Sequence, residues 1–141
     1  MKTTKTKKKR IYLDYAATTP VDPRVVKAML PYFTEKFGNP ASIHSAGTEA
    51  NKALEKARAT FADYLSCDTT EIFFTSSATE SNNWAIKGIA SAYKIKGKKI
   101  IVSSVEHDCV LNSSKWLSQN GFEVERAPVD EFGTVKIEEL K

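Results

Sequence analysis

Hydrophobic residues along this chain alternate between helical and strand-like spacing, and the alternation predicts most of its elements. Apolar side chains three or four positions apart predict helices at residues 45–65, 78–93 and 109–119, with another opening at 137. Short runs rich in Ile, Val and Phe predict strands at 71–75, 98–104 and 122–127. Strands separated by helices are typical of a parallel sheet with crossover connections. The pattern therefore predicts an α/β fold.

Capping and turn residues indicate where several elements begin and end. Asp22 before Pro23 predicts a helix start, because Asp caps helices and Pro is favoured at the first helical position. Pro31 is expected to break or kink that helix. Asn120 and Gly121 predict the end of the 109–119 helix. The remaining segments are predicted as an extended stretch at 11–15, a turn at 16–20, a loop at 37–42 and a turn at 131–133.

The 45–65 helix carries an apolar stripe made largely of small side chains. Its members recur close to the 3.6-residue period and are Ala46, Ala50, Ala53, Leu54, Ala57, Phe61 and Leu65. Small side chains allow a close approach between elements. We therefore expect this stripe to pack against a sheet or another helix.

Two loops follow directly after predicted strands, at residues 76–79 and 105–108. Ligands of parallel sheets bind beyond the carboxyl ends of the strands. If the strands before the two loops are neighbours, His107 lies near the first loop. Function is therefore expected at these two loops.

The first loop is small, rich in hydroxyl groups and placed at a helix start. Ser77 and Glu80 have the spacing of a capping box. Free N–H groups and the partial positive charge of a helix N-terminus stabilise an anion, and Thr79 adds a hydroxyl donor. An ordinary helix cap without a ligand is the alternative interpretation. The loop lacks Gly-Lys-Ser/Thr, so it is not a Walker A loop.

The second loop contains His107. An imidazole at this position can stack on an aromatic ligand or shuttle a proton; the alternative is a structural or merely exposed histidine. Cys109, two residues on, suggests a Cys–His nucleophile. We reject that interpretation, because no third group that orients the pair is evident and Cys109 is expected to face the core.

The distribution of charge indicates which kinds of partner to expect. The chain has 141 residues and a formal net charge of +4, but its first ten residues hold six of the 21 basic residues and no acidic one. The rest has 15 basic against 17 acidic residues. We expect residues 1–10 to be a solvated, disordered tail, and we expect no nucleic-acid or membrane partner.

Targeting and cysteine signals are weak. No apolar run approaches the ~20 residues that span a bilayer, and the basic tail is not followed by the apolar region of a secretory signal. A cytoplasmic location is the expectation. Cys67 and Cys109 have no C-x-x-C spacing, so we expect neither a metal site nor a disulfide framework.

Four motifs occur in the order and spacing of one enzyme family. They are Tyr12-Leu13-Asp14-Tyr15-Ala16-Ala17-Thr18-Thr19-Pro20, Phe37-Gly38-Asn39-Pro40-Ala41-Ser42 with His44, Thr75-Ser76-Ser77-Ala78-Thr79-Glu80-Ser81-Asn82-Asn83, and Glu106-His107. In this respect residues 11–141 resemble the cysteine desulfurases, the NifS/IscS group of the class V aminotransferase family. One motif would be weak evidence, whereas four in register are specific.

The resemblance implies a partial type I fold of pyridoxal-phosphate (PLP) dependent transferases and a homodimer in the full-length form. It implies conversion of L-cysteine to L-alanine, with the sulfur held as an enzyme persulfide and passed to iron–sulfur scaffold proteins or to tRNA thiolation. Ala78 and Thr79, with Ser77, resemble the phosphate-binding residues, and His107 resembles the residue that stacks on the pyridine ring and assists proton transfer. The positions that resemble the substrate side and pocket edge are Asp14, Ala16, Thr18 and Asn39.

The same resemblance implies a division of the chain into three segments. They are a tail at 1–10, an arm at 11–20 and the N-terminal portion of the PLP-binding large domain at 21–141. The chain also differs from the family pattern in two respects. The family usually has glycine where Ser77 stands, which would weaken cofactor binding if the loop needs a positive φ or a close phosphate approach. The family's Schiff-base lysine, its pyridinium-pairing aspartate and its sulfur-accepting cysteine match no residue here. We therefore expect no activity from this chain alone.

Several interpretations of such a chain stay open. It is expected to be the N-terminal portion of a cysteine desulfurase from a truncated gene, a shifted reading frame or a partial gene model. The alternatives are one half of a split desulfurase and a non-catalytic binding module. A class V transaminase or a selenocysteine lyase is the alternative activity.

Overall fold

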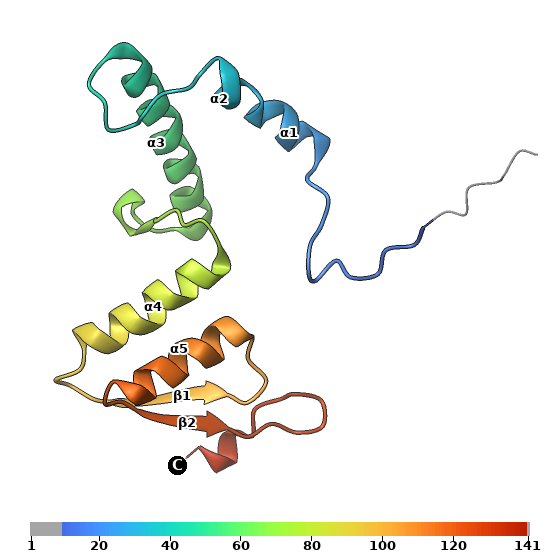
Figure 1. Ribbon diagram of the computed structural model, residues 1–141, viewed down its shortest axis with the longest axis vertical. Coiled ribbons are helices and arrows are strands. Elements are labelled where there is room, and N and C mark those ends of the chain that lie inside the picture. Colours follow the sequence, from blue (N-terminus) through green and yellow to red (C-terminus); the bar gives the residue numbers. More distant parts are fainter. Residues whose placement is uncertain (1–9, 141) are drawn as a thin grey trace, which may run out of the picture. The chain divides into compact units, whose positions relative to one another are not determined.

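The computed structural model describes residues 10–140 and divides the chain into two compact units (Figure 1). The first unit ends at Ile72 and the second begins at Phe73. The predicted disordered tail falls, apart from Arg10, outside the described residues.

The first unit is helical. Its elements are α1 (Pro23–Met29), α2 (Pro31–Thr34), α3 (Ser45–Leu65) and the short 3₁₀ helix η1 (Thr69–Glu71). Asp22 caps α1 by accepting the backbone N–H of Arg24 at 2.8 Å, which confirms the predicted start. The predicted break is also confirmed, because α1 ends before Leu30 and Pro31 opens α2. Residues 11–14 form no strand, and a turn follows at 15–17.

Helix α3 has the predicted bounds, but its apolar stripe is only partly covered. Ala53 and Leu54 are half-buried, whereas Leu65 is 66% exposed. Ser66 ends the helix in the left-handed conformation with φ 53°, and the N–H of Cys67 donates to the carbonyl of Ala62. The expectation of close packing along the whole stripe is therefore wrong for the described residues.

The strand predicted at 71–75 is also wrong. Its first residue belongs to η1, which the side chains of Asp68 and Glu71 cap reciprocally. Ile72 is extended, with φ −97° and ψ 122°, but the residues that follow pair with no strand in the described part of the chain. A run of apolar residues predicts an extended backbone, whereas a strand also needs a neighbour for its N–H and C=O groups.

The second unit contains the sheet. Its elements are α4 (Ala78–Ala92), β1 (Lys99–Ser103), α5 (Asp108–Gln119), β2 (Glu123–Ala127) and the 3₁₀ helix η2 (Ile137–Glu139). The two strands are parallel, in a register that pairs Lys99 with Glu123 and Ser103 with Ala127. The predicted helices and the last two predicted strands are confirmed within two residues. The helix expected to open at 137 is only the single turn η2.

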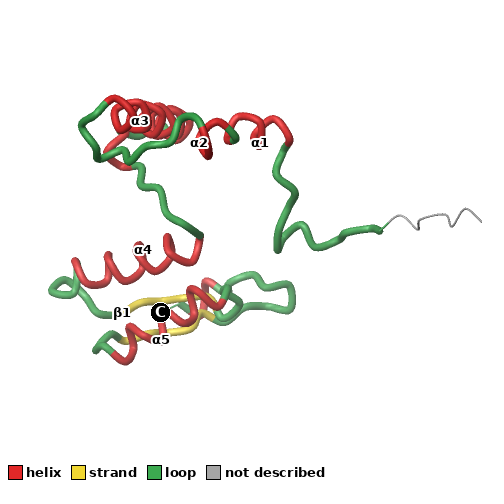
Figure 2. The backbone as a smooth tube through the Cα atoms, turned by 45° about the horizontal axis from the view of Figure 1, so that its top comes forward, coloured by secondary structure: helices red, strands yellow, loops and turns green. Residues whose placement is uncertain are grey.

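In the second unit α5 packs on the two strands, which Figure 2 shows in yellow. Helix α4 packs on α5. The core lies between α5 and the sheet, where Leu117 is fully buried and Phe122 and Ala127 are nearly so. Two buried hydroxyl groups in this core are satisfied, because Ser113 and Ser114 donate to carbonyls one turn earlier in α5.

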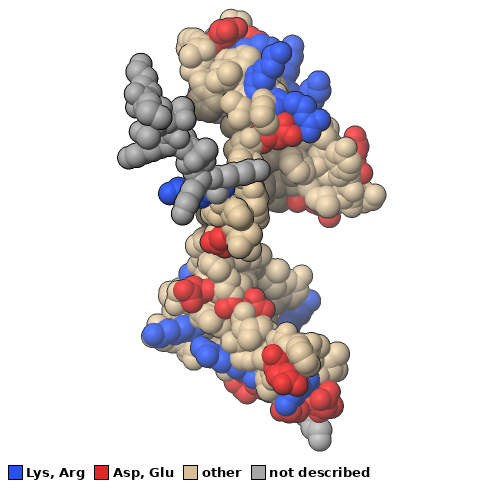
Figure 3. All heavy atoms as spheres, turned by 90° about the vertical axis from the view of Figure 1, so that its right-hand side faces the viewer, with Lys and Arg blue, Asp and Glu red and all other residues tan. Residues whose placement is uncertain are grey.

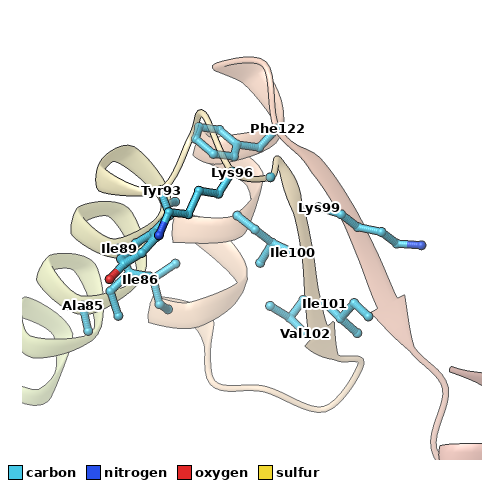
Figure 4. Close-up of a pocket in the computed structure, with 12 residues that line it drawn as sticks. Ala85, Ile86, Ile89, Tyr93, Lys96, Lys99, Ile100, Ile101, Val102 and Phe122 are labelled. Carbon is cyan, nitrogen blue, oxygen red and sulfur yellow. The ribbon is translucent and has the colours of Figure 1, made fainter. Parts of the chain in front are cut away.

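An apolar groove of about 530 Å³ runs between α4 and β1 (Figure 4). Ile86 and Ile89 of α4 face Ile100 and Val102 of β1 across it, and Phe122 closes one end. Ile89 is 62% exposed. The groove is therefore an incompletely covered part of the core.

The surface of the second unit carries both signs of charge. On the face that Figure 3 shows, Lys and Arg are interspersed with Asp and Glu in the lower part of the view. Among residues 10–140, no helix is both long and apolar enough to cross a membrane. Within the same range no group of three or more His, Cys, Asp or Glu could hold a metal ion, and both cysteines are free.

Candidate functional site

The N-terminus of α4 is shaped by two consecutive serines and one carboxylate. Ser77 is the N-cap, and its hydroxyl accepts the backbone N–H of Glu80 at 3.2 Å. The carboxylate of Glu80 accepts the backbone N–H and the hydroxyl of Ser76, at 2.6 and 2.7 Å. The predicted capping box is thus half confirmed, because Glu80 reaches Ser76 instead of the N-cap residue itself.

This cap leaves donors for an anion. In the described part of the chain, no hydrogen-bond acceptor faces the backbone N–H groups of Ser77, Ala78 and Thr79. These residues are exposed at the start of a 15-residue helix, where the helix dipole places partial positive charge. The arrangement can hold a phosphate-sized anion on backbone donors, with the Thr79 hydroxyl beside them.

Ser77 stands without backbone strain. Its φ of −167° and ψ of 162° are extended, a conformation open to any residue. The concern that this position needs a positive φ is therefore wrong for this structure. Whether the serine side chain limits the approach of an anion stays a prediction.

Glu80 is held in its charged form. The hydrogen bonds from the backbone and hydroxyl of Ser76 lower the pKa of its carboxyl below the ordinary 4.5. At neutral pH the carboxylate therefore keeps the Ser76 donors engaged, and the free N–H groups are those of the next three residues.

His107 is the N-cap of α5 and follows the carboxyl end of β1. Its Nδ1 accepts the backbone N–H of Cys109 at 3.2 Å and lies 3.1 Å from the sulfur of the same residue. Ser103, at the end of β1, donates its hydroxyl to Glu106 at 3.1 Å, which ties the loop to the strand. The ring is exposed. His107 is thus anchored through Nδ1 and free to meet a ligand.

Sequence reasoning missed Asn82. Its side-chain amide donates to the sulfur of Cys109 at 3.1 Å and thereby joins α4 to α5. Cys109 is buried, as predicted, and Asn82 is a third group beside the His107–Cys109 pair. It contacts the sulfur and not the imidazole, so it does not act directly on His107 as the orienting group of a Cys–His nucleophile would. Asn82 follows Ala78 by four residues and so shares its helix face, but this spacing does not reveal the contact with Cys109.

The remaining predicted site residues lie in the first unit. The carbonyl of Asp14 accepts the N–H groups of Ala17 and Thr18, at 3.1 and 3.5 Å, and so forms the turn that contains Ala16. All of these residues are exposed. The turn gathers three of the predicted pocket-edge residues in one short segment: Asp14, Ala16 and Thr18.

Asn39 stabilises a second turn. Its side-chain oxygen accepts the N–H of Ala41 at 2.9 Å, and its carbonyl accepts the N–H of Ser42 at 2.9 Å. The turn packs against the start of α3, where a β-carbon on Gly47 would lie 2.3 Å from the carbonyl oxygen of Ser42 and 2.8 Å from that of Asn39. Gly47 therefore permits the close approach that places Asn39.

The fold agrees with comparisons to known proteins. The family described as aminotransferase class V matches residues 11–141, so the chain belongs to the class V aminotransferase family. Within it, the chain is 53% identical over 136 residues to the cysteine desulfurase IscS of Methanosarcina thermophila. It is 55% identical over 137 residues to the cysteine desulfurase IscS of a Neisseria meningitidis serogroup C strain. Each match covers 96% of this chain and 34% of the relative.

The chain is also similar to solved protein structures. A NifS-like protein matches with a TM-score of 0.88 and 48% identity, over 94% of this chain and 36% of that one. SspA in complex with cysteine matches with a TM-score of 0.76 and 42% identity, over 83% and 34%. The chain spans about a third of the length of these relatives. The predicted partial type I fold and the resemblance to cysteine desulfurases are confirmed.

Proposed function

We propose that this chain is the cofactor-holding portion of a PLP-dependent cysteine desulfurase. The observation that carries the proposal is the pair of helix starts in the second unit. One leaves three unpartnered N–H groups at residues 77–79, and the other presents the exposed ring of His107. The names of relatives more than 50% identical favour desulfuration over transamination or selenocysteine cleavage.

The proposed phosphate site uses backbone donors of α4. The N–H groups of Ala78 and Thr79, with that of Ser77, would bind the phosphate of PLP, and the Thr79 hydroxyl would add a further donor. The helix dipole favours this charge, typically by 0.3 to about 1 kcal/mol at an exposed site. The nearby carboxylate of Glu80 opposes the binding of an anion, but it already accepts hydrogen bonds from the backbone N–H and the hydroxyl of Ser76.

His107 would cover the pyridine ring of the cofactor. When bound, PLP supplies an electron sink for bond cleavage at the substrate amino acid. The imidazole of His107 would stack on the ring and hold a proton for transfer at the reacting carbon. Asp14, Ala16, Thr18 and Asn39 are proposed for the substrate-side edge of the pocket.

The wider activity is proposed for the whole enzyme. L-cysteine would be converted to L-alanine, and the sulfur would pass as a persulfide to iron–sulfur scaffold proteins or to tRNA thiolation. A homodimer and a cytoplasmic location remain predictions, as does the division into an arm at 11–20 and a large-domain portion from 21. The 141 residues hold no Ser-x-His-Lys motif, so these residues alone are proposed to produce no alanine.

A chimera tests the proposal. Residues 11–141 would replace the matching segment of the Methanosarcina thermophila relative, and alanine release from L-cysteine would be measured with PLP present. We expect a PLP-containing enzyme with activity within about tenfold of that relative, and loss of activity in the same chimera with His107→Ala. A folded chimera that binds no PLP would overturn the proposal. Multiple-turnover alanine production by the 141 residues alone would contradict their proposed lack of activity.

A further inference from the structure

The contacts of His107 extend through Cys109 to Asn82. We propose that Cys109, held by Asn82, positions His107 and fixes its tautomer, so that Nε2 is the nitrogen that carries and exchanges the proton. The inference deepens the proposed function and rests on it for the role of that proton. Neither Cys109 nor Asn82 is expected to touch the cofactor, so both are positioning residues.

A backbone contact determines which nitrogen of His107 carries the lone pair. A neutral imidazole has one N–H donor and one lone-pair nitrogen. The backbone N–H of Cys109, 3.2 Å from Nδ1, can only donate. Nδ1 must therefore carry the lone pair, and the hydrogen of the neutral ring lies on Nε2. Because Nδ1 faces the start of α5, Nε2 on the other side of the ring faces away from it.

The thiol of Cys109 stabilises the same tautomer of His107. The side-chain nitrogen of Asn82 also only donates, so the sulfur of Cys109 accepts from it at 3.1 Å. The S–H group is then left to donate to Nδ1, which lies 3.1 Å from the sulfur. These contacts involve sulfur and are individually weak, but Cys109 is only 9% exposed, so water competes little with them.

The other histidine of the chain offers an internal comparison. His44 caps α3 in the same way, with Nδ1 accepting the N–H of Gly47 at 3.4 Å. Among the described residues, no sulfur joins that contact. The chain has only two histidines, so His44 reports what a backbone cap does without a thiol.

The test is the tautomer of each imidazole in the full 141-residue chain without PLP. Long-range ¹H–¹⁵N spectra at about pH 7.5, where an ordinary histidine is mostly neutral and an ordinary thiol mostly protonated, distinguish the protonated nitrogen from the lone-pair nitrogen. We expect His107 to carry its hydrogen on Nε2. In Cys109→Ala the minor Nδ1–H form should rise about two- to fivefold, the range expected on loss of one modest hydrogen bond.

Matched variants distinguish the loss of the contacts that position His107 from a general effect on the structure. Cys109→Ser, which keeps a donor and an acceptor, should retain the wild-type tautomer ratio. Asn82→Ala should shift the ratio in the same direction as Cys109→Ala, and it keeps the test available if that variant does not fold. Asn83→Ala is the control, because Asn83 donates to the carbonyl of Thr79 and not to the sulfur. Cys67→Ala is the corresponding cysteine control.

Two results would overturn the inference. One is a wild-type His107 with its hydrogen on Nδ1. The other is a folded Cys109→Ala or Asn82→Ala variant whose tautomer ratio equals that of the wild type. Because PLP is absent from these samples, either result leaves the proposed cofactor role untouched. Conversely, failure to bind PLP would refute that role without changing the tautomer measurement.

Discussion

The hydroxyl oxygen of Ser77 lies 3.2 Å from the backbone nitrogen of Glu80 and caps the start of α4. The carboxylate of Glu80 turns back to Ser76. Together these contacts close the first turn of the helix while the N–H groups of Ala78 and Thr79 remain available. The cap and the proposed phosphate site therefore use different donors of one helix end.

Replacing Ser77 tests the cap. Ser77→Ala should lower the free energy of unfolding of the second unit by about 1 kcal/mol, whereas Ser77→Gly should cost only a few tenths. The reason is that glycine is tolerated as an N-cap and alanine is not. Urea unfolding followed by circular dichroism measures both. A Ser77→Ala variant as stable as the wild type would show that the hydroxyl contact contributes nothing.

The contacts between Glu80 and Ser76 at the start of α4 should be sensitive to acid. The pKa of its carboxyl is lowered by the hydrogen bonds from Ser76, so the contacts are complete above the ordinary value of 4.5 and are lost as the pH falls through the lower, folded-state value. The amide proton shift of Ser76 should therefore titrate with a midpoint below 4.5. In Ser76→Ala the midpoint should rise, because one of the two donors is gone. A wild-type midpoint at or above 4.5 would contradict this account.

Two helical glycines should respond to alanine with opposite signs. A β-carbon on Gly47 would collide with the carbonyls of Ser42 and Asn39, so Gly47→Ala should destabilise the first unit by roughly 1 to 3 kcal/mol. A β-carbon on Gly88 in α4 would meet only Trp84, at 3.7 Å. Gly88→Ala should therefore stabilise α4 by up to about 1 kcal/mol. Thermal unfolding of the two variants checks the signs, and stabilisation by Gly47→Ala would show that the turn at Asn39 is not packed as described.

The apolar groove predicts binding of a hydrophobic dye. Apolar side chains line a groove of about 530 Å³ between α4 and β1, so the chain should enhance the fluorescence of anilinonaphthalene sulfonate. Ile89→Glu places at its mouth a negative charge that repels the sulfonate of the dye, and it should reduce the enhancement. Ile137→Glu changes another exposed isoleucine that does not line the groove and serves as the control. Equal effects of the two substitutions would show that the dye does not bind in this groove.

Local signals in the sequence predicted elements that are stabilised by their own residues. Asp22 and Pro23, Ser77, and the pair Asn120 and Gly121 mark helix ends through side-chain caps or backbone preferences that act within a few residues. The same locality explains why the sequence alone predicts an anion site at the start of α4. The parallel pairing of β1 with β2 followed from their connection through one helix.

Features that depend on distant partners were not predictable in the same way. Residues 71–75 have strand-like side chains but no neighbour among residues 10–140, so no strand forms. The contact between Asn82 and Cys109 crosses 27 positions and two helices, so local spacing does not reveal it. The half-completed capping box at Glu80 depended on which of two adjacent serines the carboxylate reached.

The most direct test of the central claim is a titration with pyridoxine 5′-phosphate, which has the ring and phosphate of PLP but no aldehyde to react with the lysines. Backbone ¹H–¹⁵N spectra of the 141-residue chain report each N–H group. Saturable shifts of Ser77, Ala78 and Thr79 with pyridoxine 5′-phosphate, absent with unphosphorylated pyridoxine and weakened in Thr79→Ala, are the predicted result. Shifts that leave these three N–H groups unmoved, or that are the same with both compounds, would contradict a phosphate site at the start of α4.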